Sequence, residues 1–334
     1  MDLFLSTKSE KIRMKKIVEN IGDDLKLFKK AFKSAMRTDV FLINRITGYM
    51  TGRFGKLLRP KLVLLSARMF GETNQNSIAS AVLIELLHTA TLMHDDVVDR
   101  AEERRGIPSI RSLWKNKTAV LMGDFLFSRA LINLIDLKDF NALSVLSKTA
   151  ERMSKGELLQ MEKNRSTGMD EETYFRMISD KTASLFSAAC EMGALTTTDS
   201  SEHRKSLSVY GENLGIAFQL KDDLFDFTGK KKHIGKPVGR DVKENLMTLP
   251  VIHSLSNGRL RESRKLVVAL RKKNGAQGFE EIVDFIKEKG GLDYTQEMLL
   301  SHSQKALDAI ENIEESVYKE ALTNFVQFNI DRSN

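Results

Sequence analysis

Residues 78–99, IASAVLIELLHTATLMHDDVVD, decide the fold that this sequence can adopt. Positions 78–94 are apolar or small on nearly every side, and the stretch then ends in three aspartates. A helix that is hydrophobic all round is normally buried, so we predict a core helix here. Residues 214–226, LGIAFQLKDDLFD, repeat the arrangement, with an apolar run that ends in an acidic cluster.

Both clusters have the spacing DDxxD. They consist of Asp95, Asp96, Asp99, Asp222, Asp223 and Asp226. The first and last aspartates of each cluster lie four residues apart and share a helix face, where like charges repel. Carboxylates near a helix C-terminus also oppose the helix dipole. Divalent cations would offset both costs, because Mg²⁺ binds through one or two carboxylates completed by waters and substrate phosphates.

A single DDxxD is more often a solvated acidic helix end than a metal site. Here two copies each close an apolar helix, and each is followed by basic residues. We therefore expect the two helices to face each other across a cavity and to hold metal ions between them.

The rest of the chain predicts one large helical domain. Hydrophobic residues make up 41% of 334, and only 4 prolines interrupt the chain. Apolar residues recur at helical spacing almost everywhere, strand-like alternation is nearly absent, and no linker rich in Pro, Gly or Ser divides the sequence. The expectation is an all-α fold, a single large helical bundle that spans residues 1–334 as one domain.

Charge and cysteine content restrict which partners and which cellular compartment are expected. Lys+Arg 52 against Asp+Glu 45 gives a net charge of +7, which suits nucleic acid, a membrane surface or a phosphorylated metabolite. Five tyrosines and one tryptophan offer no obvious stacking platform, so nucleic acid is not expected. The single cysteine, Cys190, suggests a reducing compartment.

The N-terminal apolar run is too short for a signal peptide, and no stretch approaches the roughly 20 apolar residues of a membrane span. A cytoplasmic protein without a transmembrane segment is expected.

Basic residues stand beside the acidic clusters and upstream of them. Lys56 and Arg59 belong to a short loop at a helix start, Arg104 and Arg105 follow the first cluster, and Lys236 follows the second. Arginine forks suit diphosphate oxygens, and lysine acts as a mobile point charge. Cations next to metal-binding carboxylates are suited to bind and ionise a diphosphate.

These motifs resemble the trans-isoprenyl diphosphate synthases, and more closely their long-chain polyprenyl members. The resemblance runs from about Gly55 to Pro250 and rests on GKLLRP, ELLHTATLMHDDVVDRAEERRG, GDFLFSRAL, KTASLF, FQLKDDLFDFTG and GKPVGRDVKENLMTLP. GGLDYT near Gly290 also looks familiar. One departure is Phe54, where the family often has a glycine. The resemblance implies an isoprenoid synthase-like bundle around a central cavity and a prenyltransferase activity.

The resemblance also implies roles for individual residues. Asp95 and Asp99 match ligands of two Mg²⁺ ions, and Asp222 matches the ligand of a third, with Asp96, Asp223 and Asp226 nearby. The positions that match the allylic diphosphate site are Arg104, Lys181, Thr182, Gln219 and Lys236. The positions that match the isopentenyl diphosphate site are Lys56, Arg59, His88 and Arg105.

The implied reaction joins isopentenyl diphosphate head-to-tail to an allylic diphosphate. The allylic C–O bond ionises, the double bond of isopentenyl diphosphate attacks the cation, and a proton leaves, with the released diphosphate as the expected acceptor. The apolar helix walls would keep water from the cation. Lys236 and Arg240 lie in a loop that could close over the diphosphate.

The resemblance further implies a homodimer, with isoprenoid or quinone side-chain synthesis as the expected use. A long apolar product would leave most easily at a membrane surface, so peripheral membrane contact is compatible with this use.

Several other activities compete with this interpretation. A geranylgeranyl or farnesyl diphosphate synthase would carry the same motifs but make a shorter product. A terpene cyclase would be expected to have an Asn/Ser/Glu-type second metal motif, whereas this chain has a second DDxxD. A di-iron bundle is suggested by Glu85 and His88, but no second Glu-x-x-His occurs. A non-catalytic partner subunit would be expected to lack some of the aspartates or arginines.

Product length is a geometric property of the helix that carries Asp95. Each further helical turn adds roughly 5 Å of tube, comparable to one isoprene unit. In the family an aromatic residue shortly before the first cluster blocks the tube, whereas Thr89, Ala90 and Thr91 are small here. We therefore expect a product longer than C20. Deeper candidates for the wall or floor are Leu83, Leu86 and Leu87.

We predict that Ala90→Phe shortens the main product, because the ring would fill the tube one turn above the aspartates. Chain-length analysis of the radiolabelled products measures this. A product of unchanged length from the Ala90→Phe enzyme would contradict the assignment.

Overall fold

A computed structural model describes residues 14–52, 55–104, 106–166, 169–228, 247–258 and 276–332. Four positions that the sequence singled out, Arg105, Lys236, Phe54 and Arg240, lie outside these ranges.

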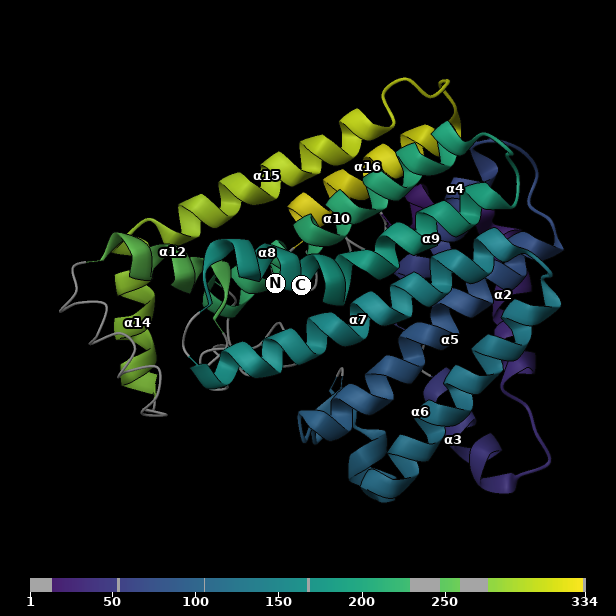
Figure 1. Ribbon diagram of the computed structural model, residues 1–334, viewed down its shortest axis with the longest axis horizontal. Coiled ribbons are helices and arrows are strands. Elements are labelled where there is room, and N and C mark those ends of the chain that lie inside the picture. The colour runs from purple at the N-terminus through teal and green to yellow at the C-terminus, as the bar shows by residue number, and fades with distance from the viewer. Residues whose placement is uncertain are drawn as a thin grey trace.

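The described chain is almost entirely helical, which confirms the all-α prediction (Figure 1). The helices before the second aspartate cluster are η1 (Glu19–Ile21), α2 (Gly22–Ala35), α3 (Phe41–Thr51), α4 (Leu58–Arg68), α5 (Gln75–Val98), α6 (Ile110–Asp136), α7 (Phe140–Ser166), α8 (Glu171–Ile178), η2 (Ser179–Ala183) and α9 (Ser184–Leu195). The remaining helices are α10 (Ser201–Thr228), α12 (Leu249–Asn257), α14 (Ala276–Glu288), α15 (Gly291–Ala309) and α16 (Val317–Asp331). Strands β1 (Glu103–Arg104) and β2 (Ile107–Pro108) form a small antiparallel hairpin.

Helix α5 is the core helix that the opening stretch predicts. It packs against α2, α4, α6 and α9, and every residue from 80 to 87 is buried. A capping box fixes its start, since Asn74 accepts a hydrogen bond from the Ser77 backbone N–H and the Ser77 side chain accepts one from Asn74. The helix ends at Val98, so the first aspartate cluster lies in its last turn.

Helix α10 is the second long core helix, and it carries the second cluster at its C-terminal end. It packs against α9 and α15, which lie on either side of it in Figure 1. Small residues permit this close packing. A Cβ atom on Gly215 would lie only 2.5 Å from the Ala183 Cα, and one on Gly211 only 2.5 Å from the Phe186 carbonyl oxygen. The contact at Gly215 brings the short helix η2 directly against α10.

Helix α6 has two apolar faces. One packs against α5 through buried residues such as Met122 and Leu126. The other remains exposed, and its large side chains are Val120, Leu121, Phe127, Leu131, Ile132 and Ile135. These six positions lie on one stripe of the helix surface.

By length and composition, α5 and α6 are the two described helices that could cross a membrane. Their most apolar windows are 61% and 33% buried inside the structure, respectively. The sequence expectation that no stretch approaches such a composition was therefore too strong. Core helices of soluble proteins pass the same test, and the burial of α5 fits that explanation.

Candidate active site

Within each cluster the first two aspartates have different surroundings. Asp95 and Asp222 are partly exposed, whereas the side chains that follow them, Asp96 and Asp223, are each only 1% exposed. Adjacent helical residues point about 100° apart, so one carboxylate faces outward while its neighbour enters the core. Both clusters therefore combine an accessible carboxylate with a buried one that anchors it.

Arg104 anchors the first cluster. Its guanidinium donates to the Asp96 carboxylate at 2.7 Å through Nε, and Nη2 lies at the same distance from that oxygen. Arg104 reaches this position because β1 of the hairpin folds back beside the end of α5. Sequence alone suggests a diphosphate ligand at this position; here the side chain neutralises a buried carboxylate.

Two neutral donors anchor the second cluster. The Tyr174 hydroxyl donates to Asp223 Oδ2 at 2.5 Å, and Gln219 Nε2 donates to Oδ1 at 3.0 Å. Burial raises the pKa of Asp223 to about 7, although both hydrogen bonds favour the ionised form. Gln219, expected at a diphosphate, is thus engaged by a carboxylate of its own helix.

A chain of polar contacts joins the two clusters through η2. The Lys181 ammonium is close enough to lower the pKa of Asp95. The next side chain, Thr182, donates its hydroxyl hydrogen bond to Gln219 at 3.1 Å, and Gln219 in turn holds Asp223. The structure therefore brings Lys181, Thr182 and Gln219 together between the aspartates.

Helix α7 contributes polar side chains to the site that the sequence did not predict. Glu157 and Gln160 accept hydrogen bonds from the Lys181 ammonium at 2.6 and 2.5 Å. Burial, and next the Glu157 carboxylate, raise the pKa of Asp95 to about 6, and the cations Lys181 and Arg104 offset only part of this shift. The site is thus rich in carboxylates and accommodates them poorly without further cations.

A second group of predicted residues meets at the start of α4. Arg59 Nη1 lies 3.1 Å from His88 Nε2, so these two positions share one site. The Arg59 guanidinium also lies over the Phe186 ring at 4.6 Å, and the exposed Lys56 ammonium lies 5.7 Å from the Phe328 ring. Pro60 stands in the first turn of α4, where a missing N–H costs nothing.

Comparison with known proteins places this site in a family. A sequence profile described as polyprenyl synthetase matches residues 41–286, most of the chain. The chain belongs to the polyprenyl synthetase family. It is a prenyltransferase by that membership. The octaprenyl diphosphate synthase of Escherichia coli (strain K12) is 33% identical over 96% of this chain and 99% of its own length.

Solved structures agree with this assignment. A polyprenyl synthase from Caulobacter crescentus, crystallised with calcium and isoprenyl diphosphate, superposes with a TM-score of 0.90 at 31% identity. The match covers 96% of this synthetase and 98% of that chain. A decaprenyl diphosphate synthase from Rhodobacter capsulatus also gives a TM-score of 0.90, at 30% identity and with 96% and 99% of the two chains covered.

The donor set of the synthetase suits magnesium. Among the described residues no three His, Cys, Asp or Glu side chains form a ready-made metal cluster. Asp95, Asp99 and Asp222 instead offer accessible carboxylates, and Mg²⁺ commonly binds one or two of these together with substrate phosphates. Hard carboxylate oxygens beside a diphosphate site are therefore the appropriate ligands.

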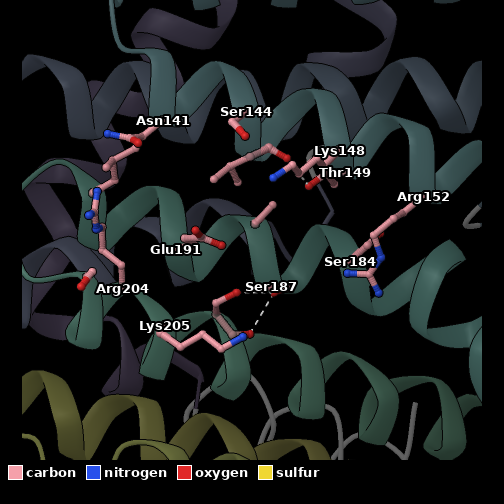
Figure 2. A pocket seen from close by; sticks show the side chains of 15 residues that line it. Asn141, Ser144, Lys148, Thr149, Arg152, Ser184, Ser187, Glu191, Arg204 and Lys205 are labelled. Carbon is pink, nitrogen blue, oxygen red and sulfur yellow. Dashed lines mark hydrogen bonds between the residues drawn. The ribbon is translucent and has the colours of Figure 1, made fainter.

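A cavity of about 440 Å³ lies between α7, α9 and α10, but it is not this site (Figure 2). Its lining includes Lys148, Glu191 and Arg204, and none of the six aspartates. At one edge Arg152 donates to Asp180 at 2.7 Å and to Glu212. Asp180 directly precedes Lys181, so Arg152 holds the η2 turn in place.

Helix η2 is a π-helical turn. Such turns insert one extra residue and often mark functional sites. Here the turn directs Lys181 toward α7 and Thr182 toward α10.

The chain-length candidates of the synthetase lie deep in the core. The side chains of Leu83, Leu86, Leu87 and Ala90 are all buried. A cavity of about 320 Å³ adjoins Asp96 and Arg104, and Thr89 lines it, whereas those four residues do not. Their role in product length stays a prediction.

Removing the Asp95 charge should stabilise the metal-free synthetase. Folding raises its pKa from an ordinary value of 3.8 to about 6. The folded state therefore disfavours the ionised form, and it loses stability as pH rises from about 4 to 6. Asp95→Asn is expected to raise the free energy of unfolding at pH 8 by on the order of 1–3 kcal/mol. This gain should shrink below pH 6.

Thermal and urea unfolding at pH 8 and pH 5, with EDTA present, measures the effect. Asp284→Asn, at an exposed position on α14, serves as the matched control and should show no such pH dependence. A destabilised Asp95→Asn variant at pH 8 would show that the site accommodates the charge without metal.

Proposed function

We propose that this synthetase is a Mg²⁺-dependent enzyme that adds isopentenyl diphosphate head-to-tail to an allylic diphosphate and releases an all-trans product longer than C20. The observation that carries the proposal is the pair of DDxxD clusters, each with one accessible and one buried carboxylate, linked through Lys181, Thr182 and Gln219. A single diphosphate between them would meet carboxylate-bound metal on two sides and a lysine on a third.

The residues divide into groups that bind the two substrates. Asp95, Asp99 and Asp222 would hold Mg²⁺, with three ions as the expected count, and bound metal would supply positive charge to the allylic diphosphate. Lys181 and Thr182 would orient that diphosphate from η2, and Arg104, Gln219 and Lys236 are assigned to the same group by resemblance. Lys56, Arg59 and His88, with Arg105, would bind isopentenyl diphosphate at the start of α4.

The arrangement accounts for a reaction that passes through a cation. Ionisation of the allylic C–O bond is favoured where positive charge converges on the leaving diphosphate. Arg59 and His88 lie together on helices that adjoin the first cluster, so the second substrate would approach from that side. The buried apolar residues of α5 and α9 keep water from the reacting carbons.

A long product is supported by the small residues before Asp95 and by several relatives. The similar proteins include an octaprenyl synthase and an all-trans-nonaprenyl-diphosphate synthase from Rhodobacter capsulatus, which is 34% identical over 95% of this chain and 97% of its own length. A short chain isoprenyl diphosphate synthase from Methanothermobacter thermautotrophicus is also 34% identical, over 83% of this chain. Identity alone therefore does not fix product length, and Thr89, Ala90 and Thr91 carry the argument.

Incubation with radiolabelled isopentenyl diphosphate, an allylic primer and Mg²⁺ tests the proposal. The expected result is a ladder that ends beyond C20, loss of product with EDTA, and a fall in kcat of several orders of magnitude in Asp95→Ala and Asp222→Ala. Product formed from the allylic substrate without isopentenyl diphosphate would instead indicate a cyclase. A product no longer than C20 would favour the geranylgeranyl or farnesyl alternative.

The exposed face of α6 supports the expected homodimer. A contiguous apolar stripe of this kind is rarely left open to water, and Ile135 is 70% exposed in the single chain. A second copy of the chain would cover the stripe isologously. A cytoplasmic enzyme of this kind would meet a membrane only when it releases its product.

Charges placed on this stripe should separate the subunits. The double variant Leu131→Asp/Ile135→Asp is expected to sediment as a monomer, because two carboxylates per subunit would be buried at the interface. Leu158→Asp, on an exposed part of α7, should leave the dimer intact. A wild-type chain that sediments as a monomer at micromolar concentration would contradict the assignment.

A further inference from the structure

The end of the described chain lies at the second aspartate cluster. Arg332 directly follows α16, and its guanidinium Nη2 is 2.8 Å from Asp222 Oδ1. The arginine side chain is only 5% exposed, whereas the Asp222 side chain is 43% exposed. A residue more than a hundred positions away in sequence thus contacts the accessible carboxylate of this cluster.

Other contacts hold the Arg332 guanidinium in one orientation. Nε donates to Asn329 Oδ1 at 2.9 Å, and Nη2 also donates to the Phe218 carbonyl oxygen at 2.7 Å. The guanidinium stacks over the Phe218 ring at 3.9 Å and lies 5.3 Å from the Phe225 ring. A planar, rigid donor held on several sides fixes the carboxylate that it binds.

The contact leaves Asp222 available to a further ligand. Arg332 engages Oδ1, and 43% of the Asp222 side chain remains exposed to solvent. Arg104 does something different in the first cluster, where it neutralises the buried Asp96. Arg332 instead acts on the accessible aspartate, the one expected to bind metal.

We propose that Arg332 is a positioning residue that holds Asp222 in the orientation in which it binds a divalent metal. The inference rests on the proposed function, in which Asp222 is a magnesium ligand. Hydrogen-bond partners behind a metal ligand orient it, and their loss typically weakens metal binding or activity by 10–100-fold. Arg332→Met should therefore weaken metal binding by at least about 10-fold.

Lys221 offers a matched control at the same contact between α10 and the C-terminal segment. Its ammonium donates to the Ile330 carbonyl oxygen at 2.7 Å and lies 5.3 Å from the Phe225 ring. Lys221→Met therefore loosens the same C-terminal segment and removes one positive charge, but leaves the partner of Asp222 in place. A purely structural role for the segment would make both variants behave alike.

The proposal is tested by measuring manganese binding to the enzyme in the presence of inorganic diphosphate. Binding is monitored by electron paramagnetic resonance, with an enzyme-free blank as the reference. The expected result is at least a 10-fold higher half-saturating manganese concentration for Arg332→Met and a change of less than about 2-fold for Lys221→Met. Arg332→Lys, which keeps the charge without the planar fork, should recover part of the affinity and serves if Arg332→Met does not fold.

Equal affinities of wild type and Arg332→Met, or equal losses in Arg332→Met and Lys221→Met, would overturn the inference while leaving the proposed function intact. A wild-type enzyme that binds no manganese with diphosphate would contradict the proposed function, and the role of Arg332 would fall with it.

Discussion

The structure depends on keeping several carboxylates charged at the end of an apolar helical core. Each aspartate cluster closes a helix that contributes many residues to the core, so some of its carboxylates are withdrawn from water. Burial raises the pKa of both Asp95 and Asp223. Such a site is stable as an anion only when cations or donors converge on it, and this requirement accounts for the positions of Arg104, Tyr174 and Lys181.

Both clusters meet this requirement in the same way, with one buried aspartate and one accessible aspartate. Asp96 and Asp223 are buried and bonded, which fixes the helix ends, while their neighbours Asp95 and Asp222 stay accessible. From η2, Lys181 lies close to Asp95, and Thr182 donates to Gln219, which holds Asp223. Folding therefore leaves a deficit of positive charge, which bound Mg²⁺ ions would fill. The same deficit of positive charge destabilises the folded protein when no metal is bound.

The family resemblance assigns Arg59 and His88 to the same substrate, and the structure places their side chains 3.1 Å apart. Sequence alone predicts the helices and the clusters, because apolar periodicity and DDxxD spacing are local signals. It does not predict the partners that arrive from other helices. Glu157, Gln160 and Tyr174 carry no motif of their own, and Arg332 lies in an ordinary C-terminal sequence. The π-helical turn at Lys181 depends on Gly215 and Arg152, which pack against it from α10 and α7. Arg104 is expected at the allylic diphosphate, and its ion pair with the buried Asp96 is a further contact that the sequence did not predict.

Anomalous diffraction from crystals soaked with manganese and a non-cleavable allylic diphosphate analogue would locate the metal ions and the diphosphate. Anomalous peaks are expected between the two helix ends, within coordination distance of Asp95 and Asp99 on one side and Asp222 on the other, with the diphosphate bridging them. Peaks confined to one cluster, or a diphosphate bound away from both, would show that the two clusters do not form one metal site.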